Sequence, residues 1–118
     1  MTEEHKDKNL LTLVPNRIRE FEMEGEKAVI LLPRFSSGWP SRHIQPRLKK
    51  PTMRVRLDEI GTMVWQLVDG KRTVMEITEL IGERFGKRVI PPHERVGIFI
   101  TMMKNEGMIK LEDPEDVS

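Results

Sequence analysis

The chain has 118 residues, which is room for one domain with a modest core and excludes a multidomain enzyme. Charged residues make up 33% of the sequence but the net charge is only +1, so there is no overall basic signature of a nucleic-acid-binding protein. The sequence contains no cysteine, which excludes disulfides, thiolate nucleophiles and cysteine-ligated metals.

The N-terminal stretch MTEEHKDKN is polar and mixed in charge, unlike the basic and then apolar start of a signal peptide. The longest apolar run, Ala28 to Leu32, is too short to span a bilayer. Together with the missing cysteines, these features lead us to expect a cytoplasmic protein without membrane association.

Three strands are predicted in the first half of the chain. The segment from Arg17 to Glu24 and the branched-residue-rich KAVILLP after Gly25 are typical of a β-hairpin. From Met53 to Leu57, apolar residues alternate with two arginines, which is the period-two pattern of a strand with one buried face.

A long basic loop, residues 34–52, is predicted between the second and third strands, because proline and glycine interrupt the chain there repeatedly. From Lys27 to Leu57 the chain has lysines and arginines but no Asp or Glu, whereas its last residues form an acidic tail. The basic stretch fits a solvated loop and a patch for an anionic partner equally well.

Three helices are predicted after the third strand. Asp58 can cap the first, which Asp69-Gly70 would end. Thr73 and Glu76 form a capping box for the second, and Gly86 ends it. The third begins at Pro91-Pro92 and ends at Gly107.

The apolar positions of these helices recur every three or four residues and predict one buried stripe on each helix. They are Ile60, Val64, Leu67 and Val68 in the first helix, Val74, Ile77, Leu80, Ile81 and Phe85 in the second, and Val96, Phe99, Ile100 and Met103 in the third. Met108 is placed to pack back over the last turn, and Met108 to Leu111 predict a short final strand.

The turn between the first two helices, LVDGKRTVMEI, could be a DNA-reading element, an active-site rim or a capped hinge. DNA reading is disfavoured because Glu76, Glu79 and Glu83 on the second helix would repel phosphates. Catalysis is disfavoured because His5, His43 and His93 lack metal-ligand spacing and no nucleophile or phosphate-cradling motif occurs. We therefore interpret the turn as a hinge and expect no catalytic residue, no metal and no cofactor.

Two stretches carry a resemblance to a known family. They are Trp65-x-x-Val68-Asp69-Gly70-x-x-Thr73-Val74-x-x-Ile77 and the closing Glu106-Gly107-Met108-Ile109. The chain resembles the PqqD-like family, named for a pyrroloquinoline quinone biosynthesis protein and known as the recognition element for ribosomally made, modified peptides. The resemblance covers residues 17–111, leaving 1–16 as a polar tail and leucine-rich N-terminal extension and 112–118 as the acidic tail. The long loop and the leucine-rich extension depart from the smallest members.

The resemblance implies a winged-helix-like α+β fold, a three-stranded antiparallel sheet followed by a three-helix bundle. It also implies a non-catalytic peptide chaperone. In the family, the leader of a precursor peptide adds as an extra strand to the edge of the third strand and rests against the third helix, and a separate modifying enzyme, often a radical-SAM protein, then acts on the peptide.

The predicted peptide-binding residues lie on the edge of the third strand and on a second apolar face of the third helix. They are Met53, Arg54, Val55, Arg56, Leu57, Arg95, Ile98 and Met102. Strand addition needs an open edge and an apolar neighbour but no reactive group. Because Arg54 and Arg56 face outward on the strand, we expect a peptide with Asp or Glu between apolar anchors.

Three alternatives remain open from the sequence. The basic loop from Arg34 to Lys50 could bind nucleic acid in place of a helix. The apolar helix face could serve only to form a homodimer. The same face could be covered within the chain by the leucine-rich N-terminal segment or by the long loop.

Overall fold

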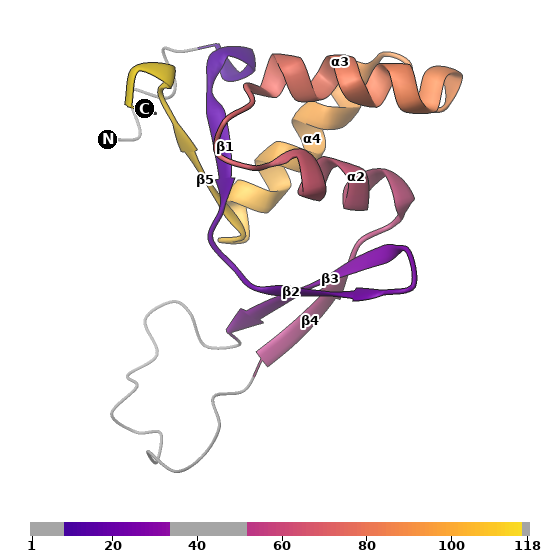
Figure 1. Ribbon diagram of the computed structural model, residues 1–118, viewed down its shortest axis with the longest axis vertical. Helices are drawn as coiled ribbons and strands as arrows, with labels where there is room; N and C mark the ends of the chain where they lie inside the picture. The colour runs from indigo at the N-terminus through magenta and orange to yellow at the C-terminus, as the bar shows by residue number, and fades with distance from the viewer. Residues whose placement is uncertain (1–8, 34–51, 117–118) are drawn as a thin grey trace.

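The structure is a computed structural model that describes residues 9–33 and 52–116, and it contains two small sheets and three α-helices (Figure 1). The strands are β1 (Val14–Arg17), β2 (Phe21–Glu24), β3 (Lys27–Pro33), β4 (Thr52–Arg56) and β5 (Ile109–Glu112). The helices are α2 (Glu59–Leu67), α3 (Val74–Phe85) and α4 (Pro92–Asn105), with short 3-10 turns η1 (Leu10–Thr12), η3 (Gly86–Val89) and η4 (Pro114–Asp116). The expected α+β class, a three-stranded antiparallel sheet followed by three helices, is confirmed.

The larger sheet has the strand order β2-β3-β4 and both of its pairs are antiparallel. The hairpin forms because Gly25 adopts a φ of 63°, a conformation that glycine tolerates without a steric penalty. Figure 1 shows this sheet at one end of the molecule, with α2 between it and α3.

The smaller sheet pairs β1 with β5, from Val14 opposite Glu112 to Arg17 opposite Ile109. The predicted hairpin is confirmed as β2 and β3, but its first arm is shorter than Arg17 to Glu24, because β1 ends at Arg17 and β2 begins at Phe21. Between them the Ile18 N–H donates to the Met108 carbonyl at 3.0 Å, so the chain passes here from one sheet to the other. The predicted final strand is confirmed as β5, and β1 is its partner.

The helix starts follow the predicted caps. The Asp58 carboxylate accepts a hydrogen bond from the Gly61 N–H at 2.7 Å, and Thr73 and Glu76 exchange both bonds of a capping box. Proline stands at the start of α4, as predicted. A helix that begins with its amides satisfied needs less help from tertiary contacts.

The first helix ends at Leu67, before the predicted Asp69-Gly70 stop. Asp69 forms an isolated β-bridge with Asn16, and the Gly70 N–H donates to the Pro15 carbonyl at 3.0 Å. Through these bonds the hinge after α2 pairs with residues of β1 and does not continue the helix. At the other end of the bundle, the peptide bond before Pro91 is cis.

The core lies between the inner face of the larger sheet and the three helices. Trp65 of α2 is fully buried and meets the Phe21 ring edge-on, with centroids 5.6 Å apart. The predicted stripes are buried except at Leu80 and Phe99, which are only partly buried because they lie at the margins of their stripes. No helix among the described residues is long and apolar enough to cross a bilayer.

Candidate functional site

β4 forms one edge of the larger sheet, and in the described part of the chain it pairs only with β3. The Leu57 N–H, just past the end of β4, donates to the Ala28 carbonyl at 2.9 Å. Since the direction of main-chain groups alternates along an antiparallel strand, Val55 also faces β3, whereas the N–H and C=O groups of Arg54 and Arg56 point away from the sheet. These groups form an open edge that an extended segment could pair with.

Apolar side chains of β4 lie next to this open edge, on the inner face of the sheet. Met53 and Val55 lie opposite Leu32 and Ile30 in the strand register, so all four share the inner face of the sheet. Met53 is 41% exposed and Val55 is partly buried, whereas their neighbours on β3 are buried. An added strand would therefore find apolar contacts on its inner face.

The two arginines of β4 lie on the opposite face and are paired within the sheet. Arg54 contacts Glu22 at 3.0 Å and Glu24 at 2.5 Å, and Arg56 also pairs with Glu24. The guanidinium of Arg56, and then that of Arg54, lowers the pKa of Glu24 below its ordinary value. Val29, beneath these pairs, is almost fully buried.

The pairing changes the electrostatic expectation. Glu22 and Glu24 already balance the charges of Arg54 and Arg56, so these two arginines do not provide the free positive charge on which the expectation of an acidic peptide depended. Any preference for acidic residues must come from other cations near the edge.

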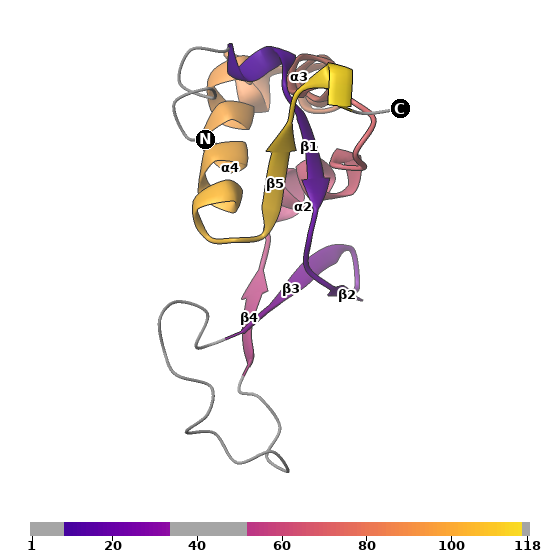
Figure 2. The ribbon, with the colours of Figure 1, turned by 90° about the vertical axis from the view of Figure 1, so that its left-hand side faces the viewer.

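One face of α4 contacts the first turn of α2, which follows β4 in the chain. Arg95, Ile98, Phe99 and Met102 follow the i, i+3, i+4, i+7 spacing of a single helical face. Phe99 packs so closely on Gly61, in the first turn of α2, that a Cβ built at Gly61 would lie 2.8 Å from the ring. In Figure 2, α4 and β4 lie toward the same side of the molecule, and β2 lies toward the other.

The predicted residues of the helix are unequally exposed. Ile98 is 65% exposed, Arg95 is exposed and Met102 is partly buried. Phe99 was assigned to the core only, but its partial exposure and its place between Arg95 and Met102 make it part of this face. The spacing alone could have indicated this, because Phe99 is four residues from Arg95 and three from Met102.

Two hollows flank this face of α4. The first, of about 540 Å³, is named here the basic hollow and is lined by Lys27, Asp58, Glu59, Ile60, Arg88 and Arg95. The second, of about 690 Å³, lies along the outer side of α4 and includes Ile98, Met102 and Leu10 of η1. Leu10 therefore borders part of the apolar surface of α4. It belongs to the leucine-rich N-terminal segment, which was one of the segments that could cover this surface within the chain. The long loop lies outside the described residues, and so does the basic segment proposed for nucleic acid.

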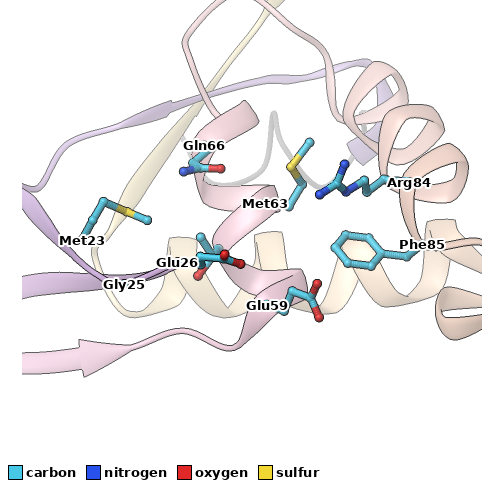
Figure 3. Close-up of a pocket in the computed structure, with 9 residues that line it drawn as sticks. Met23, Gly25, Glu26, Glu59, Met63, Gln66, Arg84 and Phe85 are labelled. Carbon is cyan, nitrogen blue, oxygen red and sulfur yellow. The ribbon is translucent and has the colours of Figure 1, made fainter.

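A third hollow, of about 320 Å³, lies on another side of α2 (Figure 3). Met63, Arg84 and Phe85 gather at one side of it, and Met23 of β2 stands at the other. Across the described ranges, 9–33 and 52–116, no group of three or more His, Asp or Glu side chains is placed to hold a metal ion.

The family comparison agrees with the resemblance seen in the sequence. The family model described as Coenzyme PQQ synthesis protein D (PqqD) matches residues 49–109, which is more than half of the chain. No curated protein and no solved structure matches the sequence. The matched range contains β4, all three α-helices and the start of β5, so it includes the open edge and the apolar helix face. The chain belongs to the PqqD family.

Proposed function

We propose that this protein is a non-catalytic peptide chaperone. It captures the leader of a ribosomally made precursor peptide by strand addition to β4 and presents the peptide to a separate modifying enzyme, with a radical-SAM protein as the first choice. The observation that supports this most strongly is the pair of outward main-chain groups at Arg54 and Arg56. The exposed apolar face of α4 contacts the start of α2, just after β4, through Phe99.

The two parts of the proposed site would contribute differently. Main-chain hydrogen bonds to Arg54 and Arg56 would hold any extended segment and so provide affinity without sequence preference. Met53 and Val55 on the strand and the α4 side chains Phe99 and Met102 would select apolar residues on the inner face of the added strand. Methionine suits such a role because its side chain adapts to more than one partner.

Hydrogen exchange of backbone amides tests the proposal directly. The probe is a peptide selected from a random display library for binding to the full chain. We expect the amides of Arg54 and Arg56 to exchange more slowly once the peptide is bound, since they gain acceptors. The amides of Val55 and Leu57, which already face β3, should change little. Protection confined to other elements would contradict strand addition at this edge.

A proline variant separates the main chain from the side chain. Arg54→Pro removes an outward donor but leaves the ladder to β3 intact, a position that proline tolerates on edge strands. Arg54→Ala removes the same ion pairs and keeps the donor. We expect Arg54→Pro to weaken peptide binding about threefold to tenfold more than Arg54→Ala does, as for one lost hydrogen bond. Equal losses in both variants would show that the side chain, not the main chain, is responsible.

Homodimerisation is the second candidate, and the exposure of Ile98 favours it specifically. Sedimentation of the wild type and of Ile98→Lys would detect it. A dimer abolished by the substitution, with peptide binding unchanged, would assign this part of the helix to self-association.

A further inference from the structure

The basic hollow lies at the C-terminal end of β4. Ala28 bonds to Leu57 across the sheet, so the next pair in the register places Lys27 level with Asp58, just past β4. Arg95 enters the hollow from the start of α4, and the nearly buried Ile60 contributes an apolar wall. A strand added to β4 would enter or leave the sheet here.

The acidic side chains of the hollow already have partners. Asp58 accepts the Gly61 N–H as the cap of α2, and the Glu59 carboxylate accepts a hydrogen bond from Arg88 at 2.8 Å. The Arg88 guanidinium also lowers the pKa of Glu59, so this carboxylate stays ionised and bound to its own arginine. Neither acid needs a further cation.

Two cations of the hollow are left without such partners. Lys27 and Arg95 are exposed, and neither makes an ion pair or side-chain hydrogen bond with any residue in the described ranges. The charge of Lys27 adds a smaller contribution to the lowered pKa of Glu59, whose carboxylate is bound to Arg88. This contrasts with Arg54 and Arg56, which are balanced by glutamates of β2. The unmatched positive charge of the edge is therefore at the end of β4 and not along it.

We propose that the basic hollow binds a carboxylate of the captured peptide, held between Lys27 and Arg95, and so gives the site its preference for acidic sequences. This rests on the proposed strand addition at β4. The planar guanidinium of Arg95 suits a two-point contact with a carboxylate, and Lys27 adds a mobile point charge. The carboxylate comes either from an Asp or Glu side chain or from the C-terminus of the peptide.

The test uses peptides selected from the random display library on the full wild-type chain. The selected peptides are expected to share an Asp or Glu at one end of their apolar segment. Synthetic copies are measured with a free and with an amidated C-terminus. A loss of affinity on amidation assigns the contact to the terminal carboxylate, and a loss on changing the acidic residue to Gln assigns it to the side chain.

Two charge variants supply the control. Lys27→Glu with Arg95→Glu should weaken binding about tenfold, because two attractive pairs become two repulsions. Lys71→Glu with Lys104→Glu changes the net charge equally at exposed sites outside the hollow and should leave binding nearly unchanged. A peptide whose acidic residue is replaced by Lys should regain affinity for the first variant only. All four positions are exposed, and a neutral pair, Lys27→Gln with Arg95→Gln, is available if the reversed pair fails to fold.

The outcomes separate this inference from the proposed function. If binding is sensitive to Arg54→Pro but shows no acidic preference, or if both charge variants weaken it equally, the carboxylate contact is wrong and strand addition stands. If no selected peptide is sensitive to Arg54→Pro, strand addition at β4 is wrong and this inference falls with it.

Discussion

At the scale of single residues, Asp69 determines the shape of the hinge between α2 and α3. Its Oδ1 accepts the N–H groups of Lys71 and Arg72 at 2.9 and 3.1 Å, and its Oδ2 accepts the Arg72 guanidinium at 2.6 Å. Partial burial raises the pKa of this carboxyl, but the backbone hydrogen bonds and the Arg72 charge outweigh burial, so the pKa lies below the ordinary 3.8. One ionised side chain thus closes a turn that lacks regular structure.

The lowered pKa predicts how stability depends on pH. A carboxyl whose pKa is lower when folded stabilises the protein above its unfolded pKa and loses that effect as the pH falls through the folded value. The free energy of unfolding should therefore decrease below pH 3.8, and the difference between wild type and Asp69→Asn should shrink over the same range. Urea titrations at a series of pH values measure both. A difference that does not change with pH would contradict the role given to the Asp69 charge.

At the scale of elements, the contact between α4 and α2 depends on a glycine. Gly61 has no side chain where the Phe99 ring rests, whereas Gly97, in the middle of α4, has open space around the position of a Cβ. Both glycines lie within helices, where alanine is intrinsically favoured. They differ in what a methyl group would meet, since Gly61 is buried in the first turn of α2 and Gly97 is only partly buried in α4.

These two glycines therefore give a matched pair of substitutions. Gly97→Ala should raise the free energy of unfolding by up to about 1 kcal/mol, the helix propensity difference. Gly61→Ala should not, because its Cβ would force Phe99 to move, and the displaced ring should weaken the binding of a library-selected peptide. Chemical denaturation and peptide titration measure the two effects. A gain of stability in both variants would show that the Phe99 ring can move without lowering the free energy of unfolding.

The sequence predicted the elements whose signals are local. The Asp58 and Thr73 caps depend on residues three apart, and the stripe of each helix repeats within one or two turns. β1 was missed because it is four residues long, contains Pro15 and is stabilised by β5 near the other end of the chain. The third strand of the larger sheet was predicted, but the pairs of Arg54 with Glu22 and Glu24 were not, because they join residues about thirty positions apart.

At the scale of the whole molecule, the region matched by the family model is not a complete core. Residues 49–109 lack β1, β2 and β3. The missing strands and η1 region contribute buried side chains that α2, α3 and β4 pack against: Leu13, Val14, Ala28, Val29, Ile30 and Leu32. The Leu13 carbonyl also accepts the Val74 N–H at the start of α3, at 2.9 Å. Among the described residues before β4, the stretch from 13 to 32 thus contributes to the core.

A fragment and a point variant check this conclusion. The fragment 49–109 should show no cooperative unfolding transition, because β4 loses its only described partner and much of the core is missing. In the full chain, Leu13→Ala should lower the free energy of unfolding by about 2 to 5 kcal/mol, whereas exposed Thr12→Ala should cost far less. Calorimetry of the three proteins measures these values. A cooperatively folded fragment would show that the helices are self-sufficient.

The open edge of β4 could also pair with another copy of the protein. Any extended chain, including a second β4, could add there and begin aggregation. The strand limits this hazard in two ways: it is only five residues long, and two of its side chains are charged. Short, charged edge strands are poor templates for pairing between copies. Protection against self-pairing and access for the proposed peptide strand therefore depend on the same five residues.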